Sequence, residues 1–325
     1  MLGMLRKIIG IAVMTLPAVV AANFVYVGQW GNYGTGNGQF HNPHGLAISS
    51  SGKVYVSDYG NHRIEYFTLS GSYLGKWGAF GDGMNLFNHP SAIAIAPSGN
   101  VYIADSGNNR IQYFTQNGIY QGKWGNYGSS NNQFNNPQGI AIDPATMRVY
   151  VADAGNNRIS YFSLNGVYLG KWGTQGNGNG QFNHPYGVEV APNGNIYVAD
   201  TGNNRIQYFN SNHMYLGKWG VSGNDDGQFS HPNDLAIDSV PWVYVSDSNN
   251  NRIQYFTITG SYLGLWGDNG SSAGQFNNPW GIDTTGTGTY IYVADNNNNR
   301  VQYFHRVEVD VEPATLGIIR ALFNR

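Results

Sequence analysis

The segment NVYIADSGNNRIQYF, residues 100–114, decides the fold. Its two ends are short runs of β-branched and aromatic residues, which favour strands. Between them, Ser106-Gly107-Asn108-Asn109 supplies residue types that accept a tight reversal and a positive φ. Two further runs of the same character, at 92–95 and 119–124, lie beyond Gly-containing turns on either side. Together the four runs predict one antiparallel four-stranded sheet.

The same unit occurs six times along the chain. Three landmarks, a Trp, an Arg and a Pro, each recur at intervals of 47 or 48 residues. A four-stranded unit of this length that repeats six times predicts an all-β, six-bladed β-propeller. The landmarks are Trp30, Trp77, Trp124, Trp172, Trp219 and Trp266; Arg63, Arg110, Arg158, Arg205, Arg252 and Arg300; and Pro43, Pro90, Pro137, Pro185, Pro232 and Pro279.

The last copy lacks the Trp-Gly strand with which the other copies end. A matching run, residues 23–31, precedes the first copy instead. We therefore predict that this N-terminal strand completes the last blade. Such a closure would seal the ring and remove exposed strand edges.

Composition restricts the function as well as the fold. Of the 325 residues, 41% are hydrophobic and 14% are aromatic, which excludes a disordered chain. Only 11% are charged and the formal net charge is −2, so the chain lacks the excess of Lys and Arg that nucleic-acid binding requires. There is no cysteine, so packing and topology rather than disulfides must stabilise the fold.

The N-terminus differs in character from the repeats. Arg6 and Lys7, the apolar stretch 8–20 and the pair Ala21-Ala22 are typical of a secretory signal peptide. The stretch is shorter than the roughly 20 residues that span a bilayer as a helix, and an uncleaved anchor is the alternative. We therefore predict a secreted, periplasmic or cell-surface protein. The predicted parts are a signal peptide (1–22), the propeller (23–305) and a C-terminal tail (306–325).

The tail ends in a second apolar stretch. Residues 311–319 resemble the start of a PEP-CTERM-type sorting signal, although Val311 stands where that motif has its first proline and Arg320 interrupts the apolar run. The resemblance implies a degenerate sorting or anchor signal, and an amphipathic tail is the alternative. A terminal anchor is the one membrane contact that we expect.

The repeat itself resembles the NHL repeat. The shared pattern is Phe-x-x-Pro-x-Gly-(apolar)-Ala-(apolar), followed by Val-Tyr-Val-Ala-Asp-x-Gly-Asn-x-Arg-Ile-x-Tyr-Phe, in six in-phase copies over residues 24–304. The resemblance implies a six-bladed propeller. It leaves the function open, because NHL propellers include RNA-binding modules, extracellular sensor domains, peptide-amidating lyases and uncharacterised exported proteins.

An Asp and an Arg flank the turn Asp-x-Gly-Asn-x-Arg of every copy. A residue that every blade needs in the same form serves the blade, so we interpret both series as structural. The Asp carboxylate can accept backbone N–H groups in the tight turn, and the Arg fork can reach a carboxylate or free carbonyl groups. The Asp series is Asp58, Asp105, Asp153, Asp200, Asp247 and Asp295.

Ligand binding is expected where the copies differ. The residue directly after the repeated Pro differs in every copy, and these six positions should surround the central opening on the face of the inter-blade loops. Their amide, hydroxyl and aromatic groups suit a neutral polar ligand, and random drift of loop sequences is the alternative. The six positions are His44, Ser91, Gln138, Tyr186, Asn233 and Trp280.

Carboxylates also break the repeat inside the innermost strand. Glu189 and Asp283 replace an alanine, and Asp234 replaces a glycine or alanine. A carboxylate near the central channel must be hydrated, paired or bound to a metal, and oxygen ligands of this kind suit Ca²⁺. We therefore predict these three residues as candidate ligands of a Ca²⁺ ion in the channel, with water as the alternative. A second hypothesis is a histidine metal site built from residues that precede the repeated Pro, namely His89, His184 and His231.

These features predict an exported, non-catalytic binding or scaffold module. Its ligand would be a protein, a peptide or a glycan, bound by the loop face around the channel, and nucleic acid is not expected. The alternative is a metal-dependent extracytoplasmic lyase or hydrolase of the propeller type. No catalytic residue is predicted, because the chain has no cysteine nucleophile and no Ser, His and Asp that its pattern singles out together.

Overall fold

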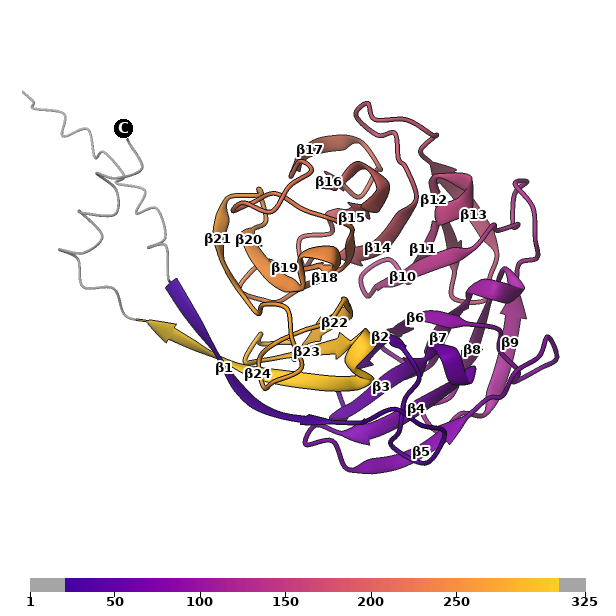
Figure 1. Cartoon of the computed structure of the whole chain (residues 1–325). Coiled ribbons are helices and arrows are strands. Elements are labelled where there is room, and N and C mark those ends of the chain that lie inside the picture. The colour runs from indigo at the N-terminus through magenta and orange to yellow at the C-terminus, as the bar shows by residue number, and fades with distance from the viewer. Residues whose placement is uncertain (1–20, 310–325) are drawn as a thin grey trace, which may run out of the picture. The chain divides into compact units, whose positions relative to one another are not determined.

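The computed structural model describes residues 21–309, and Phe24–Val307 forms a ring of six four-stranded antiparallel sheets (Figure 1). The innermost strands β2, β6, β10, β14, β18 and β22 surround the centre, and each contacts the innermost strand of the next blade. The predicted all-β, six-bladed propeller is confirmed. No α-helix occurs in residues 21–309, and no helix there has the length and apolar character that crossing a bilayer requires.

The strands of each blade follow one another from the centre outwards. Blade 1 comprises β2 (Pro43–Ile48), β3 (Lys53–Asp58), β4 (Arg63–Thr68) and β5 (Tyr73–Trp77); blade 2, β6 (Pro90–Ile95), β7 (Val101–Asp105), β8 (Arg110–Phe114) and β9 (Tyr120–Trp124); blade 3, β10 (Pro137–Asp143), β11 (Arg148–Asp153), β12 (Arg158–Ser163) and β13 (Tyr168–Trp172). Blade 4 comprises β14 (Pro185–Val190), β15 (Ile196–Asp200), β16 (Arg205–Phe209) and β17 (Tyr215–Trp219); blade 5, β18 (Pro232–Ile237), β19 (Trp242–Asp247), β20 (Arg252–Thr257) and β21 (Tyr262–Trp266). Blade 6 comprises β22 (Pro279–Thr284), β23 (Tyr290–Asp295), β24 (Arg300–Val309) and, from the other end of the chain, β1 (Ala21–Trp30).

The N-terminal strand closes the ring as predicted. β1 pairs with β24 as the outermost strand of blade 6. Phe24 stacks on Trp266 of blade 5 with ring centroids 4.0 Å apart, and the Tyr292 hydroxyl donates to the carbonyl of Leu69 in blade 1 at 3.0 Å. Both contacts join blade 6 to a neighbour, and the first of them is made by β1, which therefore completes both the blade and its interface with blade 5.

The two predicted terminal segments are largely outside the described residues. The signal peptide falls on residues 1–20 except for its last two positions, and the resemblance to a sorting signal falls on 311–319. Within the described residues, β24 continues to Val309, beyond the predicted end of the propeller at residue 305. Arg306 on this extension is buried and forms an ion pair with Asp238.

Aromatic side chains fill the interfaces between blades. Trp77, at the end of blade 1, packs on Gly118 in the β8–β9 hairpin of blade 2. Gly118 has φ +81°, and a Cβ there would approach the Trp77 ring to 2.8 Å, so the hairpin requires glycine. The fully buried Tyr55 donates its hydroxyl to the carbonyl of Gln116 in the same hairpin at 2.9 Å. Each blade thus packs on the turn of its neighbour, which gives the repeated aromatic residues a structural role.

Candidate functional site

The repeated Asp connects the turn after the second strand to the preceding inter-blade loop. In blade 1, Asp58 is fully buried at the start of the 3-10 turn η1 (Tyr59–Asn61). Its Oδ1 accepts the backbone N–H of His41 at 2.7 Å, and its Oδ2 accepts from Arg63 Nε at 2.7 Å. The turn pattern predicts that this N–H belongs to the turn itself. It comes instead from the inter-blade loop because the loop lies against the turn, where Gly60 N–H also bonds the carbonyl of His41.

The repeated Arg holds the same loop through its carbonyl groups. The Arg63 guanidinium donates to the carbonyl oxygens of Thr35 at 2.5 Å, Gly36 at 2.8 Å and Gln39 at 2.7 Å. The Asp–Arg pair recurs in all six blades with Nε–Oδ2 distances of 2.6–2.7 Å. Each pair fixes one inter-blade loop, so the face that carries these loops and turns, here called the loop face, rests on a rigid base. The other five turns are η2 (Ser106–Asn108), η3 (Ala154–Asn156), η4 (Thr201–Asn203), η5 (Ser248–Asn250) and η6 (Asn296–Asn298).

The residues before the repeated Pro have a backbone role. All six are in the left-handed region, with φ between 48° and 55°, which Asn and His adopt more readily than most residues. The His184 ring contacts Asn183, and the His231 ring contacts Asn249. Within residues 21–309, no three or more His, Asp or Glu side chains are grouped so that they could hold a metal ion. The structure therefore does not bring these histidines together, and the Ca²⁺ site stays a prediction.

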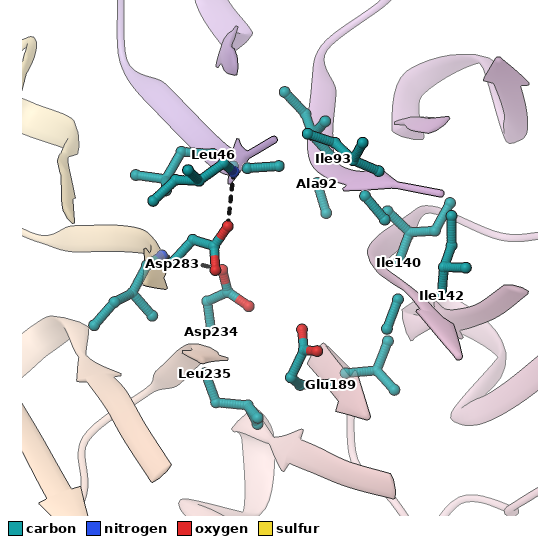
Figure 2. A pocket seen from close by; sticks show the side chains of 17 residues that line it. Leu46, Ala92, Ile93, Ile140, Ile142, Glu189, Asp234, Leu235 and Asp283 are labelled. Atoms are coloured by element: carbon teal, nitrogen blue, oxygen red, sulfur yellow. Dashed lines mark hydrogen bonds between the residues drawn. The ribbon is translucent and has the colours of Figure 1, made fainter. Parts of the chain in front are cut away.

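The three predicted carboxylates line one cavity in the central channel. The space that the centres of water molecules can occupy in this cavity is about 160 Å³, which is enough for several waters. Figure 2 shows Glu189, Asp234 and Asp283 projecting into it from three successive blades, with Ile140 and Ile142 on the opposite wall. The residues that line the cavity beside these three acidic groups are apolar ones or glycine.

Burial determines the protonation of these carboxyl groups. It raises the pKa of Glu189 to about 8, an effect that the neighbouring Asp283 and Asp234 reinforce. Burial also raises the pKa of Asp234 and Asp283 to about 7 each. Backbone N–H groups of the next blade oppose the rise, because Ile282 donates to Asp234 at 3.2 Å and Ile48 donates to Asp283 at 2.8 Å. Near neutral pH the channel therefore holds protons as well as charge.

Raised pKa values make stability depend on pH in a defined direction. In the unfolded chain Glu189 ionises near pH 4.5, whereas in the folded chain it keeps its proton up to about pH 8. The folded state therefore binds more protons between these values, and the free energy of unfolding should fall as pH rises from 4.5 to 8. Glu189→Gln should reduce that fall. Denaturant titrations at pH 5 and pH 8 test this, with Asp82→Asn at an exposed loop carboxyl as the control; equal pH dependence in wild type and both variants would contradict it.

The innermost strands approach one another closely above this cavity. Gly139 and Gly187 each follow the repeated Pro by two residues, and a Cβ on Gly139 would lie 2.0 Å from the carbonyl oxygen of Tyr186. The resulting constriction, here called the neck, measures about 10 Å³ for water centres, which is about one water molecule. Its lining includes five of the six predicted ring positions, namely Ser91, Gln138, Tyr186, Asn233 and Trp280.

The six ring positions have different surroundings. Ser91 is buried, and its hydroxyl bonds Ser106 Oγ at 2.6 Å and the carbonyl of Gln138 at 2.9 Å, so it serves the framework. His44 is also buried and is stacked between other rings. Gln138 Oε1 and Asn233 Oδ1 are buried without a hydrogen-bond partner. The prediction thus identified residues that meet at the neck, but only some of them are open to a ligand.

An unbroken series of ring contacts crosses the loop face, from the loop that joins blades 1 and 2 to blade 4. Successive ring centroids lie 3.8–5.9 Å apart, a separation at which aromatic rings attract one another. We call this series the aromatic row. Its members, in order, are Phe80, His62, His89, Tyr59, His44, Trp280 and Tyr186.

Three members of the row, Tyr59, His62 and Phe80, and two further exposed aromatic side chains, Tyr33 and Tyr127, were not predicted from the sequence. Tyr59 and His62 occupy the turn of blade 1. At the position of Tyr59 the other blades carry Ser, Ala, Thr or Asn, and at the position of His62 they all carry Asn. Tyr33, Phe80 and Tyr127, here called the loop aromatics, stand three residues after the repeated Trp and are 67–69% exposed. Blades 4–6 carry Gln, Ser and Asn at that position. Comparing the six copies at the turn and loop positions would have revealed both sets.

Comparison with known proteins decides the family. The NHL repeat model matches residues 40–67, 87–114, 134–162, 182–209 and 276–304. The chain is an NHL-repeat six-bladed β-propeller. In this NHL propeller the remaining copy, in blade 5, forms the same four strands as the matched copies. No curated protein sequence matches the chain.

Solved structures share the fold at low sequence identity. A protein of unknown function from Bacteroides thetaiotaomicron has a TM-score of 0.68 and 15% identity, over 89% of the NHL propeller and 76% of that chain. A streptogramin B lyase has a TM-score of 0.60 and 13% identity, over 89% and 98%. A gluconolactonase from Xanthomonas campestris has a TM-score of 0.63 and 12% identity, over 88% and 98%. At these identities the likeness concerns the fold alone.

Proposed function

We propose that this NHL propeller is an exported, non-catalytic binding module that takes its ligand on the loop face. The observation that carries the proposal is the aromatic row together with the loop aromatics. They break the six-fold repeat on one face, over blades whose strands otherwise repeat closely. Three large aromatic side chains at equivalent loop positions leave apolar surface exposed to solvent. Exposed aromatic surface of this kind is typical of binding sites.

The row favours an uncharged ligand. Burial, with His89 as a second influence, lowers the pKa of His44 to about 3, and burial with neighbouring histidines lowers the pKa of both His62 and His89. His62 Nδ1 also accepts the backbone N–H of His89 at 3.0 Å, which requires that nitrogen to be unprotonated. The histidines of the row are therefore neutral near pH 7. The row contains no Lys or Arg, so it offers nothing to neutralise phosphates.

The neck lies between this face and two of the channel carboxylates, Glu189 and Asp283, whereas Asp234 lines both the neck and the cavity. A passage that admits one water molecule does not admit a sugar, a side chain or a peptide. A ligand on the loop face would therefore rest over the neck without reaching Glu189 in the cavity below. This arrangement supports binding rather than acid–base chemistry by Glu189 or Asp283 on a ligand held at that face.

Truncating the loop aromatics should weaken ligand binding strongly. The triple variant Tyr33→Ala, Phe80→Ala, Tyr127→Ala is expected to lose at least tenfold in affinity, about 1.4 kcal/mol, because exposed aromatic anchors dominate binding surfaces. Displayed peptide libraries and glycan arrays, probed with wild type and variant, would provide the ligand and the measurement.

A control truncates three exposed apolar side chains elsewhere on the propeller. Leu74, Leu169 and Leu216 lie on outermost strands and are 45–46% exposed, so their triple Ala variant should bind as wild type does. If the loop variant kept its ligands and the outer-strand variant lost them, the binding face would lie on the rim of the propeller and the proposal would be wrong.

A further inference from the structure

We infer that the ligand is a neutral glycan, one of whose hydroxyl groups enters the neck. This inference rests on the proposed function and specifies its ligand class. It combines three observations at the neck: two buried acceptor oxygens without partners, a space for one small group, and ring surfaces beside that space. Each observation restricts the chemistry of the occupant.

The unpartnered atoms call for a hydrogen-bond donor. Gln138 Nε2 is already committed to Asn136 Oδ1 at 2.8 Å, which leaves Gln138 Oε1 directed elsewhere. Gln138 Oε1 and Asn233 Oδ1 are both buried acceptors, and both residues line the neck. Buried polar atoms are rarely left without a partner. An occupant with an O–H or N–H group could donate to one of them for each hydrogen it carries, whereas a carbonyl or carboxylate could donate to neither.

The size and charge of the neck select among donors. Its volume of about 10 Å³ fits one water-sized group, which a hydroxyl matches and a phosphate does not. Asp234 also lines the neck, and its carboxylate disfavours an anionic occupant. A single hydroxyl on a neutral molecule therefore fits best.

The surroundings of the neck favour a sugar over a peptide. Tyr186 and Trp280 line the neck and stack with centroids 5.9 Å apart, so apolar ring surface borders the acceptors. A sugar residue carries both a C–H surface for the rings and hydroxyl donors for the amides in one compact unit. The inter-blade loops at 31–42, 78–89 and 125–136 extend this character, because they combine the loop aromatics with Gly, Asn, Gln and Ser and contain one charged residue, Asp82.

The experiment compares sugars and neck variants in one cycle. An array of neutral and acidic oligosaccharides, run beside a peptide library, identifies the tightest neutral oligosaccharide, and calorimetry measures its affinity for wild type, Gln138→Leu and Asn233→Leu. A hydroxyl donates one hydrogen, so the variant that removes its acceptor should bind at least tenfold more weakly. The melting temperature of both variants should stay equal or rise, because an unpartnered buried oxygen has been removed. A deoxy analogue that lacks the hydroxyl in the neck should lose as much affinity, and its loss should not add to that of the weakened variant. Leu169→Ala is the control for both readouts.

The outcomes separate this inference from the proposed function. If peptides bind, and truncation of the loop aromatics strongly weakens that binding while no glycan binds, the proposed function stands and the glycan inference is wrong. If a neutral glycan binds but every deoxy analogue and both neck variants bind as tightly as their parents, the hydroxyl in the neck is wrong. If acidic glycans bind more tightly than neutral ones, the neutral ligand class is wrong.

Discussion

A chain without residues 23–31 should fail to form the folded ring. The deletion removes most of β1, and with it Phe24, Tyr26 and Trp30 from the aromatic interfaces of blades 5, 6 and 1. Loss of one large buried aromatic side chain costs about 3–5 kcal/mol, and a folded domain is stable by only about 5–15 kcal/mol. Phe24, Tyr26 and Trp30 are partly rather than fully buried, so each loss should lie below that range, but three such losses together with a missing strand ladder should still exceed the total stability. The exposed edge of β24 should also promote self-association.

Thermal melting and light scattering measure this effect. The deleted chain should show no cooperative transition at temperatures where the intact chain is folded, and it should associate. Trp30→Ala and Trp124→Ala provide the matched comparison, because Trp30 has the same place at the closure that Trp124 has between blades 2 and 3. Their destabilisation should be equal. A deleted chain that melts as the intact one does and stays monodisperse would show that β1 does not close the ring.

Arg158→Met should produce the second large effect. Its guanidinium bonds Asp153, which is fully buried, and the carbonyl oxygens of Ser129, Ser130 and Gln133 in the inter-blade loop. The substitution leaves a buried carboxylate without its cation and three carbonyl groups without their donor. Breaking a buried ion pair by removing one partner costs about 3–5 kcal/mol. At roughly 2–4 °C per kcal/mol, the melting temperature should fall by roughly 10 °C.

The control variant also removes one positive charge, but at an exposed position on the surface. Lys171 is exposed on the outermost strand of blade 3, and Lys171→Met should change the free energy of unfolding by no more than about 0.5 kcal/mol. The double variant Asp153→Leu, Arg158→Met should recover part of the lost stability, because it removes the unpaired carboxylate as well. Equal melting temperatures for Arg158→Met and Lys171→Met would mean that the framework pair does not stabilise the loop.

The strands could be predicted from the sequence because the same local signals occur six times. β8 (Arg110–Phe114) has the predicted bounds, and the closure by β1 follows from one strand that is missing at one end and present at the other. The structural role of the Asp–Arg pairs followed from their identity in all copies. Their partners did not, because the N–H that Asp58 accepts belongs to His41, seventeen residues earlier in a loop without regular pattern.

The candidate site was predictable only in part. The position after the repeated Pro was a correct guide to residues that meet at the neck, because every innermost strand begins there. The aromatic row was not foreseen, since it depends on contacts between blades: Trp280 of blade 6 meets His44 of blade 1 at 4.0 Å across 236 positions of sequence. The carboxylates were identified as exceptions to the repeat, whereas their pKa values depend on a burial that only the channel geometry reveals.

Hydrogen–deuterium exchange with the tightest ligand from the arrays, glycan or peptide, tests the central claim most directly. We expect slower exchange in the inter-blade loops at 31–42, 78–89 and 125–136 and at the turn around Tyr59, with unchanged exchange in the outermost strands β5, β13 and β17. Protection confined to those outer strands, or to the β2–β3 and β4–β5 turns, would contradict a binding site on the loop face.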